Sequence, residues 1–126
     1  GFAAQAGNLA GQAQGLRAAV DAGHLVMDPQ AAERVARVYE DKADQIMSTR
    51  QRTDALIARG AFGDCFIGQQ MEKKFEDKVR APEVGLVAIL TKVEEILRNM
   101  AQAYRDSARN MQSRDEDHAD RLGRIV

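Results

Sequence analysis

One short stretch, residues 59–65 (Arg-Gly-Ala-Phe-Gly-Asp-Cys), interrupts an otherwise long amphipathic sequence. Apolar residues recur at helical spacing before it, over residues 28–58, and again after it, over residues 65–125. Gly60 suits the left-handed backbone position that follows a helix end, because glycine enters it without a Cβ penalty. The sequence therefore predicts an antiparallel helical hairpin with its elbow at residues 59–65.

Two side chains of this elbow have expected roles. Asp64 is placed to cap the second helix, by accepting a hydrogen bond from a backbone N–H of its first turn. Phe62 is a large apolar residue in a tight connection, so we expect it to fold back between the helices. A second interruption lies at Ala81-Pro82, where the proline ring and its missing N–H predict a break or kink.

The composition favours an all-α chain of one domain and argues against nucleic acid as a partner. Aromatic residues make up 5% of the 126 residues and Trp is absent, which favours helices packed through small side chains over a sheet. The net charge of −1 gives no overall field that would attract nucleic acid. A single cysteine excludes an intramolecular disulfide and a multi-cysteine zinc site.

The sequence also carries no sign of a membrane segment. No apolar run approaches the roughly 20 residues needed to span a bilayer, and no charged-then-apolar signal peptide opens the chain. We therefore expect no membrane span. If the protein is exported, we expect it to leave the cytoplasm without a cleaved signal peptide.

Residues 1–24 are expected to form a separate N-terminal helical segment. A narrow heptad seam runs through Phe2, Ala6, Leu9, Ala13, Leu16 and Val20. Gly7, Gly11 and Gly15 recur beside the seam, and each costs about 1 kcal/mol relative to Ala inside a helix. Two interpretations stay open: the glycines admit a closely approaching partner helix, or the segment is frayed and orders only on assembly. We favour a helix that packing orders, ended by Gly23.

The hairpin is expected to occupy residues 25–126 and to begin at Asp28-Pro29. The aspartate caps the helix, and the proline fits its first position, where the missing N–H costs nothing. The apolar stripe of this helix is Val35, Tyr39, Ala43, Ile46, Thr53 and Leu56 or Ile57. The opposite, largely solvated face includes Glu33, Arg37, Glu40 and Asp44. Glu33 and Arg37, one turn apart, should attract each other.

The second hairpin helix carries the strongest heptad of the chain. Its stripe runs through Leu86, Leu90, Val93, Leu97, Met100, Tyr104, Ser107 and Met111. Beyond this stripe the sequence is polar, which predicts a frayed helical tail. A hairpin of two helices cannot cover both faces of the helix at residues 86–111. We therefore expect a partner hairpin, from a second copy of this chain or from another protein, that completes a four-helix bundle. The predicted partner interface comprises Leu86, Leu90, Val93, Leu97 and Met100.

No catalytic constellation is present, so we predict neither an enzyme nor a cofactor or metal. Nucleophilic catalysis needs a base beside the nucleophile, and no His lies near Cys65 in the sequence. Asp115 and His118 are one turn apart, but a solvated acidic tail is the preferred interpretation. The alternative function is a helical regulatory bundle that senses a small ligand. Its expected binding site is formed by Phe62, Met71 and Phe75.

Several of these features together resemble the W-x-G helical hairpin family of actinobacterial type VII secretion substrates. They are the apolar-Asp-Pro start at residues 26–29, the aromatic-Gly elbow at Phe62-Gly63, and Tyr104 late on the second helix. The cysteine-containing run 63–66 is closer to the secretion-associated hairpin proteins of the same systems. The elbow departs from the family pattern, because Phe62 replaces the Trp and Gly63 follows it directly.

The resemblance implies a non-enzymatic export substrate that pairs with a second hairpin, as a homodimer or heterodimer, and contacts a secretion ATPase. In such families, the elbow aromatic and a Tyr-x-x-x-Asp/Glu motif together form the secretion signal. Here Phe62, Gly63 and Tyr104 take these places. The second motif is incomplete, since Ala108 stands at the fourth position after Tyr104.

Overall fold

The computed structural model describes residues 1–60 and 73–125, with side chains described for residues 1–60 and 85–123. This part of the chain forms three helices, α1 (Phe2–Asp21), α2 (Pro29–Ala58) and α4 (Lys73–Ile125). No strand occurs within it, so the predicted all-α class is confirmed. The elbow residues Phe62, Gly63 and Asp64 lie outside the described residues.

The ends of α1 and α2 follow the predicted signals. The side chain of Asp28 accepts hydrogen bonds from the backbone N–H groups of Gln30 and Ala31, both at 3.1 Å. Gly23 and Gly60 have φ values of 77° and 72°, in the left-handed region that favours glycine. The predicted helix start at Asp28 and the predicted helix ends at both glycines are therefore confirmed.

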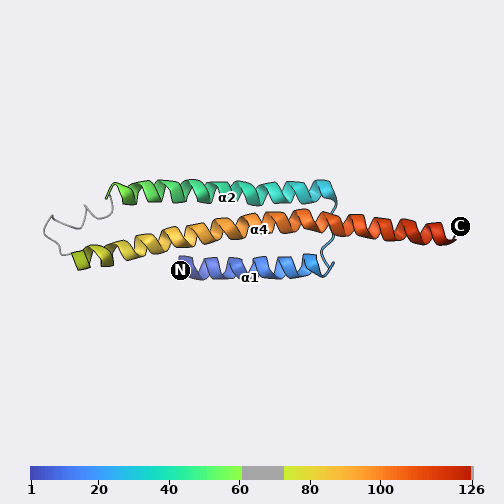
Figure 1. Cartoon of the computed structure of the whole chain (residues 1–126), viewed down its shortest axis with the longest axis horizontal. Helices are drawn as coiled ribbons and strands as arrows, with labels where there is room; N and C mark the ends of the chain where they lie inside the picture. Colours follow the sequence, from blue (N-terminus) through green and yellow to red (C-terminus); the bar gives the residue numbers. More distant parts are fainter. Residues whose placement is uncertain (61–72, 126) are drawn as a thin grey trace.

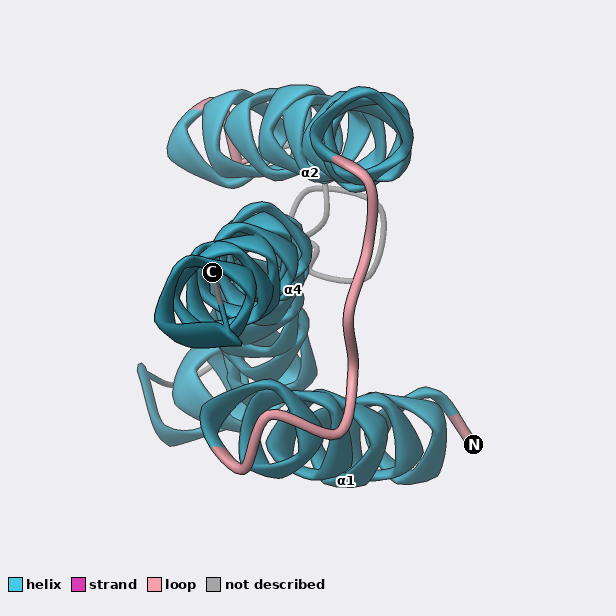
Figure 2. Cartoon of the chain, turned by 90° about the vertical axis from the view of Figure 1, so that its right-hand side faces the viewer, coloured by secondary structure: helices cyan, strands magenta, loops and turns pink. Residues whose placement is uncertain are grey.

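The three helices share one long axis, and α4 lies between the other two (Figure 1). α2 runs antiparallel to α4, whereas α1 runs parallel to it (Figure 1). Both pack on α4, but within the described chain α1 and α2 do not pack on each other. Viewed along the helices, α1 and α2 flank α4 on two sides, and residues 22–28 cross from one to the other (Figure 2).

The core of the molecule is the contact between α2 and α4. Its central cluster is Ala43 of α2 with Val93 and Leu97 of α4. Along α2 the residues that meet α4 are small, since Ala32, Ala36 and Ala43 are the fully covered positions. Small side chains let the two helices approach closely, so large apolar residues of α4 fill the space.

One expectation about α4 needs correction. The break at Ala81-Pro82 is absent, because the helix is continuous from Lys73 to Ile125. Proline removes one hydrogen bond, and this loss does not end a helix that runs from Lys73 before the proline to Ile125 after it. The polar tail is helical through Ile125, and it projects past the ends of α1 and α2 (Figure 1).

Candidate interaction surface

Apolar side chains from all three helices surround the core and are only partly covered by the chain. They are Ala6 and Leu9 of α1, Tyr39 and Ile46 of α2, and Ile89 of α4. Because α1 and α2 pack on α4 without packing on each other, the described helices leave the side between α1 and α2 without a helix above it (Figure 2). We term these five side chains the open face.

The five residues that the sequence assigned to a partner interface occupy a different place. Leu90, Val93, Leu97 and Met100 are buried within the chain, with exposed fractions of 3%, 9%, 6% and 4%. Leu86 keeps an exposed fraction of 38%. The assignment of the first four to a partner is therefore corrected: α1 and α2 both pack on α4, and these four side chains are already covered within the chain.

Tyr104 packs on α2. Its ring stacks on the ring of Tyr39, with centroids 5.3 Å apart and an interplanar angle of 26°. Lys42 places its ammonium 5.7 Å from the Tyr39 ring centre. Burial, helped by the Tyr39 hydroxyl, raises the pKa of Tyr104. The other two predicted recognition residues, Phe62 and Gly63, lie outside the described residues.

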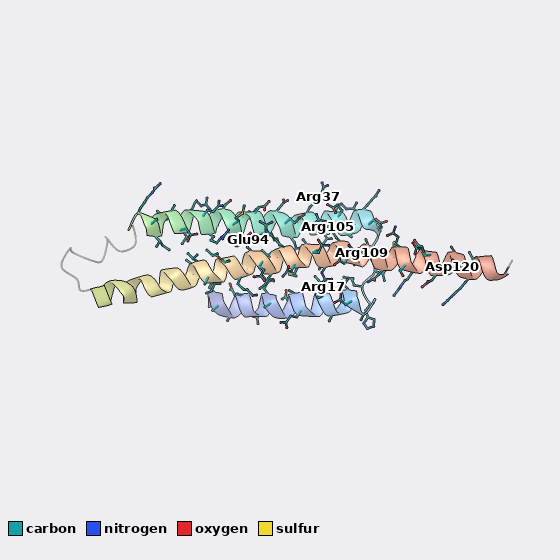
Figure 3. The ribbon with its side chains drawn as sticks, in the orientation of Figure 1. Arg17, Arg37, Glu94, Arg105, Arg109 and Asp120 are labelled. Carbon is teal, nitrogen blue, oxygen red and sulfur yellow. The ribbon has the colours of Figure 1, made fainter. Side chains whose placement is uncertain are left out.

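Ion pairs join α2 to α4 beside the core, and Arg105 of α4 pairs with two carboxylates of α2 (Figure 3). Its guanidinium donates to Glu33 at 2.9 and 3.0 Å and also to Glu40. Arg105 first, and Arg37 of the same helix second, lower the pKa of Glu33 to about 2. In turn, hydrogen bonding to Glu33 and Glu40 raises the pKa of Arg105.

Two more pairs extend this contact along the helices. Arg98 donates to Asp44 at 3.0 Å and to Glu94 of its own helix at 3.0 Å. Arg50 of α2 approaches Glu94 at 3.1 Å. We term the whole set the α2–α4 ladder: Glu33, Glu40, Asp44 and Arg50 of α2 with Glu94, Arg98 and Arg105 of α4.

The sequence interpretation missed this ladder. It placed Glu33, Glu40 and Asp44 on a solvated face, although the predicted attraction between Glu33 and Arg37 is confirmed at 3.2 Å. A signal was present in the spacing. Glu33 and Glu40 are one heptad apart, as are Arg98 and Arg105, and heptad spacing places each pair along one edge of its helix.

A separate ion pair joins α1 to α4. Arg17 donates to Asp106 at 2.9 Å and to Asp21 of its own helix at 3.3 Å. Burial alone would raise the pKa of Asp106, but hydrogen bonds from Gln102 and Arg17 hold it below its usual value. Arg17 therefore lies on the opposite side of α4 from Arg105, as the labels in Figure 3 show.

The connection between α1 and α2 is held on α4 by side-chain amide and guanidinium donors. The Asn110 amide donates to the carbonyl of Val20 at 2.8 Å and to that of Leu25 at 2.9 Å. Arg114 donates to the carbonyl of Gly23 at 2.9 Å. These bonds satisfy carbonyls at the C-terminal end of α1 and in the turn after it. Asn110 is a second residue whose role the sequence interpretation did not predict.

A groove of about 630 Å³ lies between α1 and α4. Its apolar lining is formed by Ala10, Ala13, Ala18 and Ile96. Its polar lining is formed by Gln14, Arg17, Asp21, Lys92, Asn99 and Gln102. The volume lies within the range of about 300–1,000 Å³ typical of small-molecule sites. The small side chains of α1 leave this space open.

The described residues contain neither a metal-ligand cluster nor a membrane-spanning helix. Within residues 1–60 and 73–125, no group of three His, Cys, Asp or Glu side chains is placed to hold a metal ion. In the same part of the chain, no helix combines the length and apolar character needed to cross a membrane. His118 and Asp115 are both exposed on the projecting end of α4. Cys65 lies outside the described residues.

Comparisons with known proteins add no further identification. No protein-family model, curated protein or solved structure matches the chain. The class of the molecule therefore rests on its own geometry, which is an all-helical chain with an apolar face left partly covered.

Proposed function

We propose that the chain is a non-enzymatic interaction module of the helical hairpin type, in which α2 and α4 form the hairpin. Its open face receives a second helical hairpin, from another copy or another protein, and the two form a bundle of at least four long helices. The observation that supports this proposal is the open face itself, where apolar side chains of three helices surround the core and stay partly exposed. Burying such side chains favours association, because apolar area removed from water is stabilising.

The setting that we propose for this module is type VII secretion, as a secreted or secretion-associated protein. The support is the resemblance of residues 26–29, Phe62-Gly63 and Tyr104 to the W-x-G hairpin family. In this setting the elbow would be read by the secretion machinery, including its ATPase. Tyr104 would then contribute by fixing α4 to α2 through its stack on Tyr39.

A pair of matched variants tests the open face. Ile46→Lys places a charge on the open face, whereas Val38→Lys places it on the same helix at a position that is already 52% exposed. Light scattering should show that the native chain, alone or with a co-expressed helical hairpin neighbour, forms a complex that Ile46→Lys weakens and Val38→Lys preserves. Circular dichroism controls for the fold, since a half-buried lysine can extend its ammonium to water.

Equal complex mass for both variants would contradict the proposal. A complex that forms only with the co-expressed neighbour would identify a heterodimer, and one that forms alone would identify a homodimer.

The α1–α4 groove supports a second candidate, a bundle that senses a small ligand. The expected site near Phe62, Met71 and Phe75 is not within the described side chains, but the groove offers about 630 Å³ elsewhere in the molecule. A panel of small amphipathic carboxylates should then raise the melting temperature of the isolated chain. Ile96→Trp should abolish the effect, because the indole would fill the groove. No shift with any member of the panel would remove this candidate.

A further inference from the structure

α1 is attached to α4 unevenly along its length. Its ion pair and its hydrogen bonds to α4 involve Arg17 and Val20, and the turn after it adds Gly23 and Leu25. Among the described residues, no hydrogen bond or ion pair joins residues 2–16 to α4. The first three quarters of α1 are therefore held by apolar contact alone.

That apolar contact is modest. Val20 is the buried residue of α1, whereas Phe2 at the other end has an exposed fraction of 47%. Gly7, Gly11 and Gly15 face open space, since a Cβ at any of them would meet nothing within 4 Å. These glycines weaken the helix without serving any close approach inside the chain. Over residues 2–16, only this modest apolar contact therefore opposes the release of α1, and the remaining attachment is the set of polar bonds at Arg17, Val20, Gly23 and Leu25.

The surface beneath α1 requires a cover. Ile96 borders α1 across the groove and has an exposed fraction of 5%, and Ala6 and Leu9 pack against the cluster that contains Val93. Removal of α1 would expose this part of α4 to water, which is unfavourable for apolar surface. The released state is therefore stable only where another helix replaces α1.

We propose that α1 is exchanged between two copies of this chain, so that the face of α4 under α1 is an interface between copies. Residues 22–28 act as the hinge, and α1 of each copy docks on α4 of the other. The second copy is the occupant because the fit is already present within one chain: the seam of α1 against α4, with Arg17 opposite Asp106 at 2.9 Å. An exchanged element repeats contacts that exist in the monomer and needs no new complementarity.

Reciprocal charge reversal tests the exchange. One variant carries Arg17→Asp and the other carries Asp106→Arg. Alone, each variant sets like charges against each other when α1 docks, whether on its own α4 or on that of an identical copy. In a mixed pair, the reversed α1 meets the reversed α4, and the two native residues meet each other. Both contacts are then attractive, and only exchange achieves this.

We expect light scattering of the equimolar mixture to show a species of twice the chain mass. It should appear at a concentration at least tenfold lower than for either variant alone. The chain with both substitutions, R17D/D106R, restores attraction within one molecule and should match the native chain. A mixture that keeps the mass of one chain would overturn the exchange, as would doubling of mass to the same extent in each variant alone.

Hydrogen exchange supplies a second measurement that does not depend on mass. Amides of residues 2–21 should exchange faster in each single variant and slow again in the mixture, while amides of residues 29–58 stay protected throughout. Unchanged rates over residues 2–21 in the mixture would also overturn the exchange. Repeating the mixture with Ile46→Lys in both chains separates this interface from the open face, since exchange predicts that the species of doubled mass persists.

Discussion

α2 and α1 pack on the same helix, yet the two contacts differ in kind. α2 meets α4 through a core of small and large apolar residues and through a ladder of ion pairs that runs from Glu33 to Arg50. α1 meets α4 through half-buried small residues and through polar contacts gathered at one end, around Arg17 and Asn110. The first contact fixes the register of two long helices. The second contact positions the end of a helix and leaves the rest weakly held.

The largest expected effect concerns the core that α2 shares with α4. Leu97→Ala removes a side chain that is 6% exposed in the central cluster, and such cavities cost about 2–5 kcal/mol. Urea unfolding should show this loss. Leu122→Ala, at a position that is 52% exposed on the projecting end of α4, should stay within about 0.5 kcal/mol of the native chain.

A charged double substitution in the same core should abolish the fold. Val93→Asp with Leu97→Asp would place two carboxylates inside the chain's own core, with exposed fractions of 9% and 6% in the native protein. Loss of the fold is the expected result, because a buried unpaired charge is strongly destabilising. A folded double variant would mean that these side chains are not in the core.

The next prediction concerns the anchor of α1. Asn110→Ala removes the side-chain donor from the carbonyl of Leu25 and from that of Val20, which keeps the N–H of Gly23; the loss of such bonds costs about 1–3 kcal/mol. Hydrogen exchange should speed up over residues 2–21 and stay unchanged over residues 29–58. The matched control is Asn99→Ala, an exposed asparagine on the same helix. If Asn110→Ala destabilised α1 and α2 equally, the two contacts would form one cooperative unit.

The α2–α4 ladder predicts a pH dependence of stability that depends on Glu33. The pKa of Glu33 is about 2 in the folded chain, below its usual value of 4.5. A carboxyl group with a lowered pKa contributes stability that is complete above pH 4.5 and is lost as the pH falls towards 2. In Arg105→Gln this loss should be smaller, so the melting temperatures of the variant and the native chain should converge in acid.

Arg37→Gln is the control for that experiment. Arg37 contacts the same carboxylate at 3.2 Å, but from the same helix and with 73% of its side chain exposed. Its removal should change the melting temperature less than Arg105→Gln at neutral pH, because exposed pairs contribute little. An equal effect of the two substitutions would mean that the contact between helices adds nothing to the pair within α2.

The helices themselves were predictable because their signals are local. Capping by Asp28, the helix end at Gly23 and the left-handed backbone of Gly60 depend on a few neighbouring residues, and each was found as expected. The predicted break at Pro82 was wrong, because the proline did not end the helix in which it lies. Local chemistry therefore places helix ends well and helix interruptions poorly.

The candidate surface was less predictable, because it depends on which helix covers which face. The stripe of α4 from Leu90 to Met100 was recognised as apolar, but its cover was assigned to a partner. No local pattern states that α1 folds back beside α4 and takes one side of this stripe. Asn110 was missed for the same reason, since its acceptors lie 90 and 85 residues away in the sequence.

The smallest predicted effect addresses the glycines of α1 directly. Gly11→Ala should stabilise α1 by up to about 1 kcal/mol, since the added methyl group meets nothing within 4 Å. Gly23→Ala, the same chemical change one turn past the seam, should destabilise by about 1–2 kcal/mol, because φ is +77° there. Hydrogen exchange over residues 2–21 reports both changes.

The effect of Gly11→Ala on assembly also decides between two roles of the glycine repeat. If Gly11→Ala stabilises the isolated chain and leaves its assemblies intact, the glycine repeat serves to keep α1 weakly held, as the exchange of α1 between copies requires. If the variant is stable alone but no longer assembles, the glycines admit a closely approaching helix of another chain, because one methyl group at a helix crossing is enough to separate two backbones. α1 would then be a partner-binding helix in its docked position, and the contrast with α2 would lie in what each helix binds rather than in how firmly it is held.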